Sequence, residues 1–468
     1  MNFKHFYFSI LRQPKGFYRS IIALMAPIVL QNLITQTVAL ADTIMVGMLG
    51  EEYLAAATMA ATPMFIFMIF TFGVQSGAGI LVSQYWGKGN AGAINRVLGV
   101  GLYFSFIVTF AAAVIVALFP QPILNLVTID KSLVAIGAPY ARIVGFAQAL
   151  NAISMIYLSC QRSMENARIG VIVLSISSVF NIILNWILIF GKFGLPALGM
   201  EGAAIATLFA RVLEVVIVSI YACKSKLLPL KIALLLRPGM VIFKDFVKYS
   251  LPVLLNEALY GLGAMLYPII LGHMAGAQQV LAAYTVAGNL ERLFAAVVFA
   301  SGAATAVIIG REIGAGRTDR VESVAKSLIM LGVMLGICSG GLLLLACFMV
   351  LEPYVYPLFE LSEAAASNAT VMLIILACAI PIRTVGFTMG IGILRGGGDV
   401  KALMYIDVGS LYLISVPMAA FTGLVLNAGI AIVYSSILAE EIIKSILLTI
   451  RVRSRKWIND VTREALVP

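Results

Sequence analysis

The sequence predicts an all-α polytopic membrane protein, and three observations lead to this class. Hydrophobic residues make up 61% of the 468 residues and charged residues only 12%, whereas soluble domains contain about 45–50% apolar and about 25% charged residues. The apolar runs are long and continuous, unlike the alternating strands of a membrane β-barrel. Lysine and arginine are sorted between alternate connections of these runs.

Twelve segments have the length and apolarity of a membrane-spanning helix, which needs about 20 apolar residues. Clusters of Gly, Pro and polar residues separate them, as in 87–90 (GKGN) and 396–399 (GGGD). Glycines in the second segment, at 73, 77 and 79, indicate close helix packing. We expect spans at approximately 20–48, 54–83, 98–119, 135–160, 169–190, 200–222, 247–272, 280–310, 327–351, 368–394, 402–425 and 428–450.

The basic residues predict the orientation of these spans. With these spans, only Lys131 and Lys192 fall in connections on one side of the membrane, and the other connections and both termini carry nearly all the remaining Lys and Arg. The positive-inside rule then places both termini in the cytoplasm of a multi-pass protein of the cell (inner or plasma) membrane. This topology explains the net charge of +10. We therefore expect contact with membrane lipid and no nucleic-acid partner.

The chain also repeats itself. Residues 26–32 (APIVLQN) resemble 251–257 (LPVLLNE), and 54–60 (LAAATMA) resemble 281–287 (LAAYTVA). Both halves start on the same side, which predicts a parallel repeat of six spans. We expect an N-terminal lobe at 1–222, a cytoplasmic linker without a fold of its own at 223–246, and a C-terminal lobe with a cytoplasmic tail at 247–468. Two such bundles suit alternating access, although duplication for stability alone is the other interpretation.

The segment 26–50 contains a carboxylate, Asp42, inside an otherwise apolar span. A charged residue in the middle of a span costs roughly 2.5–3.5 kcal/mol on insertion scales, so it usually faces a bundle interior or a watery cavity. This favours an ion site at Asp42; the alternative is a residue near the helix end that reaches the lipid headgroups. We expect Gln31, Asn32 and Gln36 of the same span to line a substrate cavity.

Three neutral oxygen-bearing residues are predicted at a similar depth to Asp42. From about 1.5 Å of rise per residue, Asp42 lies roughly 9 Å below the outer end of its span, Asn185 roughly 8 Å and Asn181 roughly 14 Å below theirs, and Thr207 roughly 10 Å down its own. One carboxylate with three neutral oxygens suits Na⁺, and the carboxylate alone suits a proton. Each Asn or Thr can instead hold helices together, at about 0.6 kcal/mol per contact.

The C-terminal half contains a second candidate site, formed by Glu257 and Arg383. Both are predicted near the middle of the membrane, so they can pair, and a purely structural ion pair is the alternative interpretation. Pro27 and Pro252 lie inside predicted spans and leave carbonyl groups without an intrahelical partner. Pro27 is therefore a candidate hinge, although such kinks can also be static. Arg211 with Glu214 and Glu440 with Lys444 have the spacing of local helix pairs.

Several other classes of protein lack support. No G-x-x-x-x-G-K-[ST] loop indicates ATP as the energy source. The two histidines are far apart and the five cysteines form no CxxC motif, so neither a His-based metal site nor a disulfide framework is predicted. No nucleophile–base cluster suggests an intramembrane enzyme. We expect a protein that is not an enzyme and needs no cofactor.

Together, these residues resemble one known family. Pro27, Gln31 and the segment 42–47 (DTIMVG) with Gly50 look like the first helix of the multidrug and toxic compound extrusion (MATE) transporters. Segments 181–185 (NIILN) and 199–207 (GMEGAAIAT) resemble their spans 5 and 6. Pro252 with Glu257, and 394–399 (LRGGGD), resemble their spans 7 and 10. The resemblance covers essentially the whole chain.

The resemblance implies two six-helix lobes in a V and export of amphipathic, often cationic, compounds against inward Na⁺ or H⁺. Asp42, Asn181 and Thr207 then match an N-lobe cation site, Pro27 a helix-bending proline, and Glu257 an acid found in one subgroup. Asn185 stands where some members have a second acid, so the coupling ion stays open between Na⁺ and H⁺. We expect a monomer. The alternative is a lipid-linked precursor flippase of related fold, which commonly lines its cleft with cationic residues; Arg142 and Arg383 are the intramembrane arginines without an acidic neighbour in sequence.

Overall fold

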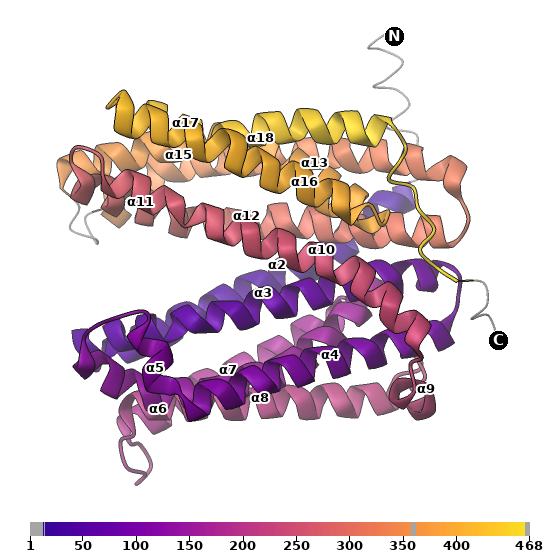
Figure 1. Cartoon of the computed structure of the whole chain (residues 1–468), viewed down its shortest axis with the longest axis horizontal. Coiled ribbons are helices and arrows are strands. Elements are labelled where there is room, and N and C mark those ends of the chain that lie inside the picture. The colour runs from indigo at the N-terminus through magenta and orange to yellow at the C-terminus, as the bar shows by residue number, and fades with distance from the viewer. Residues whose placement is uncertain (1–12, 14, 357–361, 464–468) are drawn as a thin grey trace. The chain divides into compact units, whose positions relative to one another are not determined.

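The computed structural model describes residues 13, 15–356 and 362–463, and the regular structure in these ranges is helical (Figure 1). Long helices follow one another through short connections. The first part of the chain forms α2 (Lys15–Gly47), α3 (Glu51–Gly87), α4 (Ala91–Leu118), α5 (Pro120–Asn125), α6 (Lys131–Ser163), α7 (Arg168–Phe190), α8 (Gly199–Lys224) and α9 (Ile232–Leu236).

The second part of the chain has a similar succession of long helices, but several are interrupted by π-helical turns. Its α-helices are α10 (Met240–Ala264), α11 (Leu266–Gly272), α12 (Ala277–Gly314), α13 (Thr318–Ala346), α15 (Glu363–Phe387), α16 (Val400–Ser410), α17 (Val416–Ala420) and α18 (Ile430–Arg453). The π-helical turns are η1 (Cys347–Val355), η2 (Thr388–Leu394), η3 (Leu411–Ser415) and η4 (Phe421–Val425).

Eleven helical segments in the described part of the chain are long and apolar enough to cross a membrane. They coincide with the first eleven predicted spans and confirm an all-helical, multi-span fold. The twelfth predicted span, 428–450, coincides with α18, which has the length of a span but carries Glu440, Glu441 and Lys444 in its middle. All three side chains are buried, so the protein interior, and not lipid, surrounds these charges.

Side-chain caps begin several of these helices. The Asn90 side chain accepts a hydrogen bond from the Ala93 N–H at the start of α4, and Asp130 accepts from the Ser132 N–H at the start of α6, both at 2.9 Å. Such caps satisfy backbone donors that the first turn leaves without a partner. The hydrogen bonds from Ser132 lower the pKa of Asp130. At the end of α7, Gly191 has a φ of 64°, where a side chain would meet the Ala197 backbone.

Contacts between residues divide the chain into two compact units. The C-terminal unit comprises Leu255–Val461 together with α2 up to Val29; the N-terminal unit comprises Leu30–Leu254 together with the residues from Thr462. α2 and α10 therefore each contribute to both units. Each helix changes unit just after its internal proline, Pro27 in α2 and Pro252 in α10. The lobe boundaries expected from the repeat stay a prediction.

Within the N-terminal unit, the segment expected to be a linker without structure packs on α4. Leu228 is buried, and the Asn95 side chain donates to the Pro229 carbonyl at 3.2 Å and accepts from the Lys231 N–H at 3.1 Å. A Cβ on Gly99 would lie 2.4 Å from the Leu235 carbonyl oxygen, so α9 approaches α4 closely. The Asn95 side chain thus fixes residues 229–231 against α4, and the composition of the segment gave no sign of this contact.

Candidate cation site

Asp42 of α2 and Asn185 of α7 are joined directly in the N-terminal unit. The Asn185 Nδ2 donates to Asp42 Oδ1 at 2.5 Å, and it also lies 3.4 Å from Asn181 Oδ1, one turn earlier on α7. Asn185 is fully buried, and its own Oδ1 has no hydrogen-bond partner. A buried acceptor without a partner is costly. The site therefore has a carboxylate and an unsatisfied amide oxygen on adjacent side chains.

An apolar layer lies one helical turn from these polar groups. Val46, Ile189 and Ala203 form a buried cluster, with Tyr140 of α6 packed against it. Val46 is four residues after Asp42, and Ile189 is four residues after Asn185. Residues four apart lie on the same helix face, so this cluster covers the polar layer on the side towards Gly47 and Phe190.

Thr207 of α8 falls in the same layer as the polar pair. α8 follows α7 through a short connection and packs along it, so Thr207, four residues after Ala203, lies on the Asn185 side of the apolar cluster. Its hydroxyl donates to the Ala203 carbonyl at 2.9 Å, which leaves its oxygen lone pairs as acceptors. The structure thus brings Asp42, Asn185 and Asn181 into contact and places Thr207 at their level by helix geometry.

The polar face of α7 continues to a second buried acid, Glu214 of α8. Ser177 donates to Glu214 Oε1 at 2.8 Å, Asn151 of α6 is 3.5 Å from Oε2, and Arg211 pairs with the same carboxylate. The predicted local pair of Arg211 and Glu214 is therefore confirmed. Both Glu214 oxygens have partners, so this acid is already balanced.

Sequence reasoning missed Ser177 and Tyr140 as neighbours of the site. Ser177, Asn181 and Asn185 are spaced four residues apart and are all buried on one face of α7. This spacing was visible in the sequence and identifies the polar face. Tyr140 carries no comparable signal, because an aromatic residue in an apolar span does not indicate which neighbour it will contact.

The three residues expected in a substrate cavity have different environments. Gln31 is buried, and its Nε2 donates to the Ala167 carbonyl at 2.7 Å, against Gly170 of α7. The Gln31 amide therefore binds the backbone at the N-cap of α7, and the expected role of Gln31 in a substrate cavity stays a prediction. Asn32 is half-buried and Gln36 is exposed.

The expected pair of Glu257 and Arg383 is also corrected. Glu257 accepts from Arg395 Nη2 at 2.9 Å, whereas Arg383 pairs with Glu291 and Glu441. Arg395 is 3% exposed, although its glycine-rich surroundings predicted a loop position. Helix packing decides which arginine lies within ion-pair distance of each acid. Spacing in the sequence across several spans does not predict this pairing.

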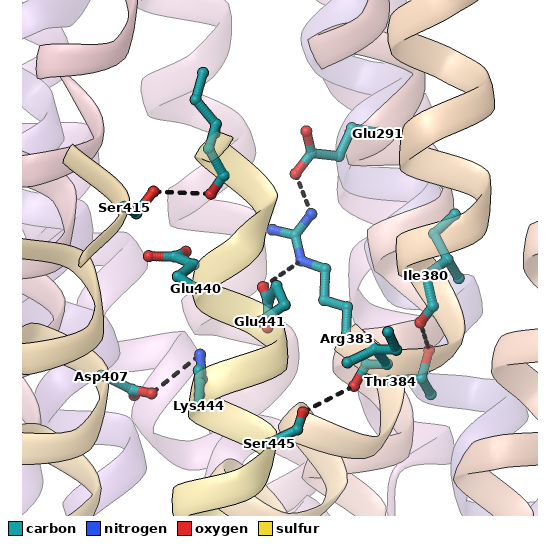
Figure 2. A network of polar contacts seen from close by, with 12 residues as sticks. Glu291, Ile380, Arg383, Thr384, Asp407, Ser415, Glu440, Glu441, Lys444 and Ser445 are labelled. Carbon is teal, nitrogen blue, oxygen red and sulfur yellow. Dashed lines mark hydrogen bonds and ion pairs between the residues drawn. The ribbon is translucent and has the colours of Figure 1, made fainter. Parts of the chain in front are cut away.

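A second polar cluster occupies the C-terminal unit (Figure 2). Arg383 lies between Glu291 and Glu441, and Lys444 Nζ is 3.0 Å from Asp407 Oδ1. The predicted pair of Glu440 and Lys444 is not the one formed, because Lys444 reaches Asp407 of α16. Groups of three or more His, Cys, Asp or Glu residues with metal-binding geometry are absent from the described part of the chain.

A multi-span helical chain with ionisable side chains buried between its spans is typical of membrane transporters. The chain belongs to the MATE family: the MatE family model matches residues 27–187 and 252–421. This confirms the resemblance seen in the sequence and identifies the protein as a transporter and not an enzyme.

Relatives and solved structures agree with this family. The chain is 27% identical to the probable multidrug resistance protein YoeA of Bacillus subtilis over 71% of each chain. It is 24% identical to the uncharacterized transporter YisQ of the same organism over 96% of this chain and 97% of the relative. The Vibrio cholerae MATE transporter VcmN in its bent form superposes with a TM-score of 0.83 at 18% identity, covering 94% of this chain and 98% of that one. At 18% identity, this structural similarity shows a shared fold.

Proposed function

We infer that this transporter is a cation-coupled exporter, which moves amphipathic and cationic organic compounds out of the cell in exchange for inward Na⁺ or H⁺. Asp42 binds the coupling ion, with Asn181, Asn185 and Thr207 as the neutral oxygen donors. Both termini lie in the cytoplasm and the protein acts as a monomer. Relatives named as multidrug resistance proteins support the substrate class.

The single observation that carries this proposal is the Asp42–Asn185 pair. Asp42 is half-buried, and its Oδ1 accepts a hydrogen bond from the neutral Asn185 amide at 2.5 Å. A carboxylate in such a place keeps an unbalanced charge that a cation can neutralise. The unpartnered Asn185 Oδ1 beside it is a ready ligand for Na⁺, whereas protonation of Asp42 requires no further ligand.

Pro27 is proposed as a hinge for the exchange between states. It lies inside α2, and the helix changes from one compact unit to the other at Val29 and Leu30. A proline removes one intrahelical hydrogen bond and makes a local bend less costly. The roughly four helical turns between Pro27 and Asp42 keep the bending point separate from the ion site.

Transport by the purified protein in proteoliposomes tests this function. A fluorescent cationic dye is supplied, and either a Na⁺ gradient or a pH gradient is imposed. We expect one gradient to drive dye flux, and Asp42→Asn to lose that flux while eluting as a folded protein in size-exclusion chromatography. Asp130→Asn, which changes an exposed carboxylate in a connection, is the matched control and is expected to retain flux.

Two results would overturn the proposal. One is undiminished dye flux by Asp42→Asn; the other is a wild-type protein that responds to neither gradient. Gradient-independent movement of a lipid-linked sugar would instead favour the flippase. That alternative has lost part of its support, because Arg383 is paired with two glutamates.

A further inference from the structure

The polar cluster of the C-terminal unit contains more acids than bases. Four carboxylates, from Glu291 of α12, Asp407 of α16 and Glu440 and Glu441 of α18, surround the two cations Arg383 and Lys444 (Figure 2). Glu440 and Glu441 are 4% and 2% exposed, and Lys444 is 6% exposed. Charges buried in this way require partners, because the interior does not solvate them as water does.

Both cations are already committed to other acids. Arg383 pairs with Glu291 and lies 3.3 Å from Glu441 Oε1, and Lys444 lies 3.0 Å from Asp407. Asp407 receives a further hydrogen bond, from Asn256 Nδ2 at 3.1 Å. These contacts give Asp407 a cation of its own and divide the Arg383 charge between two glutamates. Glu441 Oε2, like Glu440 Oε2, is buried without a hydrogen-bond partner, but Glu441 has Arg383 within ion-pair distance.

Glu440 is the acid in this cluster that has no cation within ion-pair distance. Its Oε1 accepts from the Tyr260 hydroxyl at 2.7 Å, and its Oε2 is buried without any hydrogen-bond partner. Figure 2 shows its carboxylate pointing away from Arg383. A neutral phenol supplies one hydrogen bond but no charge. Of the four acids, Glu440 therefore has the charge with the least compensation, and its free oxygen is buried in the protein interior.

The number of available ligands favours a proton over a metal ion at this oxygen. Glu440 Oε1 already accepts from Tyr260, and Lys444 Nζ lies 5.6 Å from the centre of the same tyrosine ring, so a cation and not a further oxygen occupies that side. A metal ion would need several further oxygen ligands, whereas a proton needs only Oε2. The charged and titratable groups that act on Glu440 in the described part of the chain are Tyr260 (α10), Tyr267 (α11), Arg383 (α15), and Glu441 and Lys444 (α18). Glu291 (α12) and Asp407 (α16) belong to the same cluster through Arg383 and Lys444.

We propose that Glu440 is a proton-binding site of the C-terminal unit, with the proton on Oε2 and Tyr260 bonded to Oε1. This site is separate from Asp42 and does not depend on which compound or coupling ion the transporter moves. The protein then has two carboxylates that can exchange a cation, one in each unit, and they differ in chemistry: Asp42 is next to neutral amides, and Glu440 is next to a phenol and an ammonium group.

Infrared difference spectroscopy during a pH titration tests this site without measuring transport. The purified protein is reconstituted in lipid, and the C=O stretching band of a buried carboxylic acid is followed in deuterated buffer. We expect the wild-type protein to show such a band, and ¹³C-labelled glutamate to shift it, which assigns it to glutamate and not to Asp42 or Asp407. Glu440→Gln should remove the band, whereas Glu363→Gln, at an exposed position of α15, should keep it.

A conservative variant protects the test if Glu440→Gln does not fold. Tyr260→Phe keeps the ring but removes the hydroxyl, so it should change the frequency of the band and the pH at which it titrates. The proposal is overturned if the wild type lacks a glutamic-acid band, if the band persists in Glu440→Gln, or if Tyr260→Phe leaves it unchanged. Asp42→Asn should keep the band. A failure of the proposed transport mechanism would therefore appear in the dye flux of Asp42→Asn, and a failure of the Glu440 site would appear in the infrared band.

Discussion

Glu214 and Glu441 are separated by 227 residues, the same spacing as the repeated segments 54–60 and 281–287, and the arginine that pairs with each comes from a different place in the chain. Glu214 pairs with Arg211 of the same helix, one turn away, whereas Glu441 is 3.3 Å from Arg383, which projects from α15. The N-terminal half therefore balances its buried acid locally. In the C-terminal half, Glu441 gains its arginine only when α15 and α18 pack together, so the stability of this ion pair depends on that packing.

Replacing Arg383 by Met should destabilise the C-terminal unit. The change would leave Glu441 buried and Glu291 half-buried without their cation, and breaking a buried ion pair typically costs about 3–5 kcal/mol. Denaturant unfolding of the purified protein in detergent measures the loss. Arg292→Met, at an exposed position of α12, is the control and should be nearly neutral; equal effects of the two changes would contradict this account.

Gly77→Ala should weaken the packing of α3 on α10. A Cβ at Gly77 would lie 2.7 Å from Ser250 Cα, so the two helices would have to separate, at a cost of about 1–3 kcal/mol. Gly288→Ala in α12 meets nothing within 4 Å and should stabilise the helix by about 0.5–1 kcal/mol. Melting temperatures in detergent compare the two. A stable Gly77→Ala protein would show that the contact is looser than the structure indicates.

Gln31→Leu should lower stability because it removes the donor to the Ala167 carbonyl. Losing such a hydrogen bond costs about 0.5–1.5 kcal/mol, because the Ala167 carbonyl at the N-cap of α7 still accepts a hydrogen bond within the helix. Gln36→Leu changes the same residue type on the same helix at an exposed position and should have little effect on unfolding. If Gln31→Leu is neutral for stability but alters the range of exported compounds, the result would support the predicted role of Gln31 in a substrate cavity.

Asn185→Ala should weaken binding of the coupling ion. Removing a group that holds a ligand in place typically costs 10–100-fold in ion affinity, so the ion concentration that gives half-maximal transport should rise by at least roughly tenfold. Ile183→Ala, on the exposed face of the same helix, is the control. An unchanged ion dependence in Asn185→Ala would separate Asn185 from the site even if Asp42 is essential.

The N-terminal turn of α6 should depend on pH through Asp130. Hydrogen bonds from Ser132 lower the pKa of Asp130 in the folded protein, so the carboxylate stabilises the cap above its unfolded pKa of about 3.9, and this stabilisation is lost as the pH falls through the lower folded value. Amide hydrogen exchange at 131–134, corrected for the intrinsic rate, should accelerate in that acidic range. Asp130→Asn should remove most of the pH dependence.

Much of the site on α2, α7 and α8 was predictable because helix geometry is regular. Depth along a span follows from the rise per residue, and this placed Asp42, Asn185 and Thr207 at one level. The partner of Glu257 was not predictable in this way. Arg383 is half-buried inside the long span and Arg395 is buried just after its end, and the choice between them depends on how α10 packs against its neighbours.

By itself, the sequence determined the class of fold, the spans, the repeat and the acid at Asp42, because insertion into lipid restricts each apolar segment to a helix of known length. Tertiary structure alone decided which buried charges meet. The pairing of Arg383 with Glu291 and Glu441, and the isolation of Glu440 beside Tyr260, depend on side chains from helices far apart in the chain. Their contacts arise from close packing between the faces of different helices, and residue spacing within one helix cannot predict which faces meet.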